Sequence, residues 1–284
     1  MEHFVSLDRV VTGFSFAEQS IDCSCGTEIL KVEKQSGKVV CRKGIFEKEG
    51  FSRNLIADKE QIFIYDFCML YIVRKDDYEL IGKWQLGNDL RSDIVGIAFD
   101  SDIIYCSIRN GKIITLDRES YSTNEYQISK SSMWCLKVHD KYLVCGTVDG
   151  NLLLLNKATL SIEKTLVLGK KNIGSIYVDG ETLYAASQDG KLFKIDLTAF
   201  EISALRKYTH KKMFDCVGVY KDTVVTVSYP CSEIGFWDKK TLEHVKTINV
   251  PLKLLGRAYI ENDFLYIASR NILGIDKIVL GCLA

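Results

Sequence analysis

Seven stretches of this 284-residue chain repeat the same order of apolar runs and turn residues. In the three clearest, which are consecutive, the shared turn ends on Gly111, Gly150 and Gly190, so the period is 39 and then 40 residues. A period of this length indicates small structural units that bury their apolar faces only against their neighbours. The repeated segments are, in chain order, Ile21–Val32, Ile62–Val73, Ile94–Asp117, Cys135–Asn156, Ile173–Asp196, Val225–Asp238 and Phe264–Asp276.

Each unit has the pattern of four short β-strands. The first three segments are rich in β-branched and aromatic residues, which favour strands, and the fourth follows a loop of about five residues. The second and third segments are joined by Asn110-Gly111, Asp149-Gly150 or Asp189-Gly190, which are dipeptides that suit a tight hairpin. No window shows a sustained helical period with caps. The repeat therefore predicts an all-β fold, a seven-bladed β-propeller with four antiparallel strands per blade.

We predict a single propeller domain over residues 1–284 in which the N-terminus closes the ring. The last unit holds only three strands and ends near Ile278, and an unpaired sheet edge invites association with other chains. Residues Glu2 to Ser6 precede the first unit's own first strand, so they are expected to pair with the last blade. The predicted blades span about residues 10–47, 51–87, 93–129, 133–168, 172–208, 213–249 and 253–280, with the N-terminal strand at 2–6.

The sixth unit ends its third strand on Phe236-Trp237-Asp238, and at this position the chain resembles the WD-repeat family, which carries its Trp-Asp dipeptide there. The other units keep an apolar residue followed by a polar one, as in Leu116-Asp117 and Ile195-Asp196. The family's Gly-His pair before each first strand is missing everywhere, so its hydrogen-bond tetrad of His, Asp, Ser/Thr and Trp is not expected to form. The resemblance implies the propeller architecture and leaves the subfamily open, with quinoprotein-like and lactonase-like propellers as alternatives.

The overall charge of the chain is balanced, with 37 Lys and Arg against 37 Asp and Glu. No global field therefore draws the protein towards nucleic acid or a membrane surface. No apolar run reaches the ~18 residues of a membrane span, and the first residues lack the apolar core of a signal peptide. The ten cysteines lie mostly in strand-like segments, so we expect reduced, buried thiols in a cytoplasmic protein. Only Cys23 and Cys25 are close in sequence, and no second pair stands at zinc spacing.

The sequence shows no catalytic motif, and we expect a protein that is not an enzyme and carries no metal or cofactor. Its four histidines fall in different blades, whereas a catalytic or metal site needs several such groups at one point. The polar residues expected nearest a central channel, Asp22, Asp66 and Asn54, have the pattern of turn and strand-end residues. The alternative is a propeller enzyme, such as a metal-dependent lactonase or hydrolase, with its site in the central channel.

The repeat register separates the charges that the overall balance conceals. Loops between blades are rich in Lys and Arg, whereas loops between first and second strands are rich in Asp and Glu. These two sets of loops lie on opposite faces of a propeller, so a basic and an acidic face are expected. Asp also favours tight turns for conformational reasons, which is an alternative explanation for the acidic loops. The predicted partner-binding residues on the basic side are Arg53, Arg91, Arg109, Trp134, Lys171, Lys211, Lys212, Met213, Lys253 and Arg270.

Trp134 follows Ser131-Ser132-Met133 at the start of the fourth unit. An exposed Met and Trp in that position are typical of a binding hot spot, and the alternative is the ordinary start of a buried strand. Together these features predict a non-catalytic scaffold that binds an acidic or phosphorylated protein or peptide on its basic inter-blade loops. Nucleic acid is the least favoured partner, because the charge is balanced and no aromatic platforms are interleaved with the basic residues.

Overall fold

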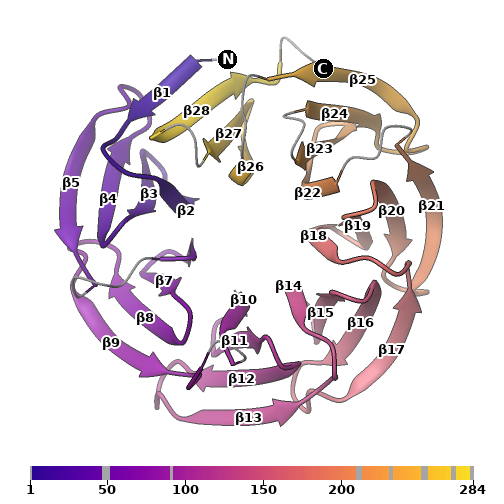
Figure 1. The fold of residues 1–284 in the computed structure, drawn as a ribbon, viewed down its shortest axis with the longest axis horizontal. Helices are drawn as coiled ribbons and strands as arrows, with labels where there is room; N and C mark the ends of the chain where they lie inside the picture. Colours follow the sequence, from indigo (N-terminus) through magenta and orange to yellow (C-terminus); the bar gives the residue numbers. More distant parts are fainter. Residues whose placement is uncertain are drawn as a thin grey trace. The chain divides into compact units, whose positions relative to one another are not determined.

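The computed structural model describes residues 2–46, 52–89, 92–208, 213–229, 233–250, 255–269 and 273–281. These residues form seven four-stranded antiparallel sheets and no helix, which is the seven-bladed β-propeller fold predicted from the repeat (Figure 1). Consequently the described residues include no helix long and apolar enough to cross a membrane. The chain divides into two compact units, Met1–Leu90 with Val250–Ala284, and Arg91–Asn249.

The first unit contains three blades with the strand orders β2-β3-β4-β5, β6-β7-β8-β9 and β26-β27-β28-β1. Every pair of neighbouring strands within them is antiparallel. The strands are β1 (Glu2–Ser6), β2 (Val11–Phe16), β3 (Ser20–Cys25), β4 (Glu28–Glu33), β5 (Val39–Gly44), β6 (Asn54–Ala57), β7 (Gln61–Tyr65), β8 (Met69–Arg74), β9 (Leu80–Gln85), β26 (Leu255–Glu261), β27 (Phe264–Ser269) and β28 (Gly274–Val279).

The second unit contains four blades, each built from four strands that follow one another in sequence. The strands are β10 (Ile94–Phe99), β11 (Ile103–Ile108), β12 (Lys112–Asp117), β13 (Thr123–Gln127), β14 (Met133–His139), β15 (Tyr142–Thr147), β16 (Asn151–Asn156), β17 (Ile162–Val167), β18 (Ile173–Asp179), β19 (Thr182–Ser187), β20 (Lys191–Asp196), β21 (Glu201–Lys207), β22 (Met213–Tyr220), β23 (Thr223–Tyr229), β24 (Glu233–Asp238) and β25 (His244–Asn249).

The predicted closure of the last blade by the N-terminal strand is confirmed. Strand β1 pairs antiparallel with β28, from Glu2 opposite Lys277 to Ser6 opposite Gly274. Val5 is only 2% exposed and joins an apolar cluster that contains Phe14. The strand thus covers an edge of β28 and part of the core, and this explains why a distant segment of the chain completes the blade.

The turn between the third and fourth strands of most blades has a recurring construction. In the second unit a side-chain oxygen at its first position accepts two backbone N–H groups: the Asp117 carboxylate accepts them from Glu119 and Ser120. The fifth residue then has a left-handed backbone, with φ of 54° at Leu160 and 58° at Phe200. The polar residue after each third strand, noticed in the sequence as an echo of the Trp-Asp dipeptide, therefore shapes this turn.

In three of these turns in the second unit, the left-handed residue packs against the preceding blade. Leu160 lies in one apolar cluster with Ala98 and Tyr105, and Phe200 lies in another with Val144. Leu242 is fully buried in a cluster with Tyr184 of the preceding blade. The turns therefore act as apolar anchors between neighbouring blades of the second unit, at the cost of an unfavourable backbone conformation.

Trp237, in the sixth blade, is buried as expected for the position of the Trp-Asp dipeptide. Its indole Nε1 donates a hydrogen bond of 2.9 Å to the Thr226 hydroxyl, and the His244 ring packs edge-on at 5.1 Å. The Thr–Trp part of the network typical of WD repeats is thus present in this blade, although the chain lacks the family's Gly-His pair.

Candidate functional site

Two loops between blades of the second unit, residues 128–132 and 168–172, are held at both ends by backbone hydrogen bonds. We call them the basic loops. At their starts, the carbonyl of Gly111 accepts the Ser129 N–H, and the carbonyl of Gly150 accepts the Leu168 N–H. At the end of the first loop the Val148 N–H donates to the Ser132 carbonyl at 3.0 Å, and Gln188 and Asn172 repeat this contact. The hairpin turns between second and third strands therefore fix the backbone of both loops.

The turn glycines are required because the basic loops pass so close to them. Gly111 has φ of 83°, and a Cβ atom there would lie 2.1 Å from the Ser129 carbonyl oxygen. Gly150 has φ of 89°, and its Cβ would lie 2.7 Å from the carbonyl group of Gly169. The sequence analysis explained these glycines by the conformation of a tight hairpin, and the close approach of the loop is a second reason for glycine at both positions.

Replacing Gly111 with alanine is expected to lower the free energy of unfolding by at least about 2 kcal/mol, because a side chain costs roughly 1–2 kcal/mol in the left-handed region and also displaces the loop. Thermal unfolding followed by circular dichroism should show a fall of about 4–8 °C. Gly44→Ala is the matched control, since a Cβ at Gly44 meets no atom within 4 Å. Equal melting temperatures for the two variants would contradict the role assigned to Gly111.

The basic loops present three exposed ammonium groups. Lys130, Lys170 and Lys171 are all solvent-exposed, and none forms an ion pair with the acidic groups of the described residues. Lys191 lies beside the second loop, where its Nζ forms an ion pair of 2.7 Å with Asp189. The lysines in the loops are therefore available to an incoming anion, whereas Lys191 already has a partner.

Arg109, another predicted partner-binding residue, is held by Asp93. Its guanidinium makes two hydrogen bonds to that carboxylate, one of 2.9 Å from Nη2, and this pairing raises the pKa of Arg109. Asp93 is only 1% exposed, so the carboxylate is a buried counter-charge and not a competing surface group. Arg109 thus adds less positive charge to this surface than its sequence position suggests.

Trp134, the second residue of β14, is a large apolar side chain with 37% of its surface exposed. The pairing of β14 with β15 shifts register between Met133 and Cys135, so Trp134 is the extra residue of a β-bulge. Met133 is completely buried, as the ordinary start of a buried strand would be, and only Trp134 has the exposure of a binding hot spot. Val148, in the neighbouring hairpin turn, is also 37% exposed. The bulge therefore places an aromatic side chain at the surface near the end of the first basic loop.

The remaining predicted partner-binding residues are placed only in part. In the first unit the Arg53 guanidinium stacks on the Phe67 ring, 4.1 Å from its centre. Met213 begins β22, and Lys171 belongs to the second basic loop. The other predicted residues, Arg91, Lys211, Lys212, Lys253 and Arg270, lie outside the described residues.

Acidic residues in the turns between first and second strands have a conformational role. The Asp58 carboxylate accepts the backbone N–H groups of Glu60 and Gln61, and Asp100 does the same for the two corresponding residues of its own turn. These contacts support the explanation of the acidic loops as tight turns that favour Asp. They do not explain the lysines of the basic loops.

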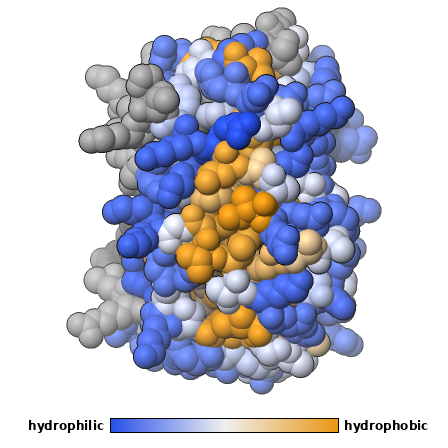
Figure 2. Space-filling model, turned by 90° about the vertical axis from the view of Figure 1, so that its right-hand side faces the viewer, coloured by the Kyte–Doolittle hydropathy of each residue, from blue (hydrophilic) through white to orange (hydrophobic). Residues whose placement is uncertain are grey.

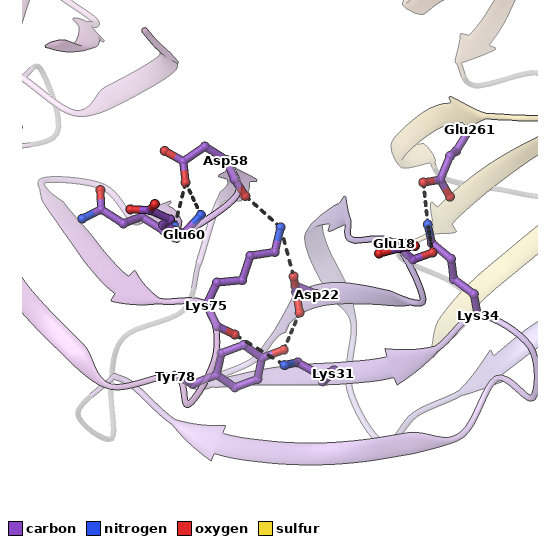
Figure 3. Close-up of polar contacts among 10 residues, drawn as sticks. Glu18, Asp22, Lys31, Lys34, Asp58, Glu60, Lys75, Tyr78 and Glu261 are labelled. Carbon is purple, nitrogen blue, oxygen red and sulfur yellow. Dashed lines mark hydrogen bonds and ion pairs between the residues drawn. The ribbon is translucent and has the colours of Figure 1, made fainter. Parts of the chain in front are cut away.

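Asp22 is a buried carboxylate between two blades of the first unit (Figure 3). It accepts a hydrogen bond from the Tyr78 hydroxyl and lies 3.7 Å from the Lys75 ammonium. Burial raises the pKa of Asp22, and the contacts with Tyr78 and Lys75 oppose that rise. The Lys31 ammonium stacks on the Tyr78 ring at 5.0 Å. These contacts join the blade of β3 to the next blade through the turn between β8 and β9, which carries Tyr78 at its left-handed position. We call a turn that packs its left-handed residue on the preceding blade an anchor turn.

The other two polar residues expected near a channel have separate surroundings. The Asp66 carboxylate accepts the N–H groups of Cys68 and Met69 in a hairpin turn. Asn54 is 8% exposed in β6, where its side-chain oxygen lies close to Gly13. Neither residue is among the contacts of Asp22 described above.

Possible metal ligands in the described residues come together in one place. His139 Nε2 lies 3.9 Å from an Asp140 carboxylate oxygen and 3.8 Å from a Glu181 oxygen, and all three ligand atoms are within 4.8 Å of one another. Both carboxylates are well exposed, and we assign no metal to this cluster. Cys23 and Cys25 are both buried thiols, and burial raises the pKa of Cys25 to about 11. The eight cysteines of the described residues carry no disulfide.

An apolar patch lies on the outer strands of the second unit, on the side where β21 is drawn in Figure 1, and is visible in Figure 2. Its members are the exposed side chains of the fourth strands, which alternate with charged residues and were not singled out in the sequence. They are Ile162, Val167, Ile202, Leu205 and Val245. Charges of both signs flank the patch, so its surroundings do not specify a partner; in the same strands they are Glu163, Glu201, Lys164, Arg206, Lys207 and Lys246.

Comparisons with known proteins bear on the fold. No protein-family model matches the chain, and no curated protein matches it. The crystal structure of the computationally designed Ika8 protein has a TM-score of 0.75 and 12% identity, over 98% of this chain and 100% of that one. The WD40 β-propeller domain of Doa1 has a TM-score of 0.77 and 13% identity, over 94% of this chain and 92% of that domain. At these identities the likeness establishes a WD40-like seven-bladed propeller fold and nothing finer.

Proposed function

We propose that this chain is a protein-interaction scaffold that binds an acidic or phosphorylated segment of a partner protein on the basic loops and Trp134. The observation that carries the proposal is the set of three exposed lysines without acidic partners in the described residues, on loops fixed at both ends. Propellers with a WD40-like fold commonly serve as interaction scaffolds, and the fold likeness supports that class of function.

The construction of the basic loops suits binding without rearrangement. Their backbone hydrogen bonds to the neighbouring hairpin turns are already formed, so little conformational entropy is lost when a partner binds. Ammonium groups attract carboxylates and, more strongly, phosphate groups, which carry up to two negative charges. Trp134 adds an aromatic surface of the kind that dominates binding energies in protein interfaces.

Affinity capture from a cell lysate, quantified by mass spectrometry, tests the proposal with a charge-reversed variant. Lys130→Glu, Lys170→Glu and Lys171→Glu are combined in one chain, and a second variant carries Trp134→Ala. We expect partners of the wild-type protein to be depleted at least tenfold with either variant, since reversal of three interface charges and loss of an aromatic anchor each remove about 2 kcal/mol.

The matched control reverses three exposed lysines of the same unit outside the basic loops, Lys141→Glu, Lys207→Glu and Lys240→Glu. It changes the net charge by the same amount and is expected to retain the wild-type partners. Circular dichroism verifies that all variants are folded. Partners that bind the two triple variants equally would refute the assignment of the basic loops.

A further inference from the structure

Three polar side chains at the junction of β1 and β28 form a continuous hydrogen-bonded chain. The imidazole Nδ1 of His3 lies 2.8 Å from a carboxylate oxygen of Asp276, and its Nε2 lies 2.8 Å from the Ser6 hydroxyl. A neutral imidazole satisfies both contacts when Nδ1 carries the proton and donates it to Asp276, while Nε2 accepts the hydrogen bond from Ser6. This tautomer makes Nε2 the basic atom, directed at the serine oxygen.

The three hydrogen-bonded side chains differ in burial, from the buried Asp276 to the exposed Ser6. Asp276 is 1% exposed, whereas the side chain of His3 is 42% exposed and Ser6 lies at the surface. Gly274, opposite Ser6 in the sheet, leaves room for the imidazole: a Cβ there would lie 3.1 Å from His3 Cε1 and 1.7 Å from the Val5 carbonyl oxygen. A buried carboxylate therefore orients an imidazole whose far side contacts an accessible hydroxyl.

We propose that Ser6 is an activated nucleophile that takes an acyl group from a carboxylic ester, with His3 as its general base and Asp276 as the positioning residue. The assignment rests on the order of the groups and on their distances, since an activated serine requires a base within hydrogen-bond reach and a third group that orients the base. It goes beyond the proposed scaffold function and would revise the expectation that the protein has no catalytic residue.

The reaction has two balanced steps. Ser6 Oγ attacks the ester carbonyl carbon while its proton passes to His3 Nε2, and collapse of the intermediate breaks the ester C–O bond. The leaving alcohol takes the proton from His3, so that the acyl group remains on Ser6. Water then attacks the acyl carbon with His3 again accepting a proton, and the carboxylic acid departs as Ser6 recovers its hydrogen.

Sequence reasoning missed this group because its members are far apart in the chain. His3 and Asp276 are separated by 273 positions and meet only through the pairing of β1 with β28. That pairing was predicted, but its register shifts between His3 and Val5. The shift decides which side chains share a face, and nothing in the residue pattern indicates it.

A fluorophosphonate probe, which reacts with activated serine hydroxyls by forming an O–P bond and releasing fluoride, tests the proposal on the full chain. Peptide mass spectrometry compares the labelling rate of Ser6 with that of Ser203, an exposed serine whose hydroxyl donates to the Lys194 carbonyl. We expect Ser6 to react at least about 100-fold faster, because general-base catalysis contributes about 10²–10⁴. His3→Gln should reduce the Ser6 rate by a similar factor and leave Ser203 unchanged.

The two serines are compared within one molecule, so the result does not depend on the stability of any variant. Labelling of Ser6 at the rate of Ser203 in the folded wild-type chain would overturn the proposal and leave the three residues as a structural link between β1 and β28. Fast labelling of Ser6 that persists in a folded His3→Gln variant would also overturn it, because the reactivity would then have another source.

Discussion

Replacing Phe200 with alanine is expected to lower the free energy of unfolding by about 3–5 kcal/mol, as for other buried phenylalanines. Phe200 is 4% exposed in a turn between strands, and it packs into the apolar cluster of the preceding blade. Its loss opens a cavity between two blades. Alanine also keeps the cost of a left-handed backbone, since φ is 58° at this position. Urea unfolding followed by circular dichroism measures the change.

Ile202→Ala is the matched control for this prediction. Ile202 is an apolar residue of the same blade, two positions along the chain, but it is 39% exposed on β21. We expect it to cost less than about 1 kcal/mol, as surface substitutions usually do. If the two variants were equally stable, the anchoring of one blade on the next by Phe200 would be refuted.

Deletion of residues 1–6 is expected to lower the melting temperature by about 10–20 °C and to cause aggregation. The deletion removes a buried Val5, worth about 1.5–3 kcal/mol, together with the hydrogen bonds of the β1–β28 pair at about 1 kcal/mol each. It also exposes the edge of β28, which then pairs with other chains. Differential scanning calorimetry and light scattering measure the two effects.

The point variant Phe4→Ala separates loss of the strand from loss of a contact. Phe4 is only partly buried and packs edge-on against Tyr266 at 5.8 Å, while the backbone pairing of β1 does not depend on it. This variant should scatter light as the wild type does, with a smaller fall in melting temperature. A truncated chain that showed no aggregation and melted at the wild-type temperature would show that β1 is dispensable for the fold.

The architecture was predictable because each of its determinants is local and repeated. The hairpin turns at Gly111 and Gly150 need a left-handed backbone, which glycine adopts without strain, and the spacing of these glycines revealed the period. Closure by residues 2–6 followed from counting strands against the requirement that edges be covered. The anchor turns were not predicted, because residues as different as Tyr78, Leu160 and Phe200 occupy the left-handed position.

The candidate site was less predictable because it depends on pairing and register. From the sequence we expected Arg109 to add its positive charge to the basic face, whereas in the fold it pairs with the buried carboxylate of Asp93. The sequence left open whether Met133 and Trp134 lie at the surface or begin a buried strand, and a β-bulge makes one of them buried and the other exposed. Lys171 is exposed, since its loop between blades lies outside every sheet, and its role in partner binding stays a prediction.

Binding of an acidic or phosphorylated partner to the basic loops can be measured with a purified captured partner. Isothermal titration calorimetry, before and after phosphatase treatment of the partner, gives the dissociation constants of the wild type and of the Lys130→Glu, Lys170→Glu, Lys171→Glu variant. We expect the variant to bind at least tenfold more weakly, a loss of about 1.4 kcal/mol, and we expect added salt to reduce the difference between the two dissociation constants. Equal dissociation constants for the wild type and the variant would contradict this expectation.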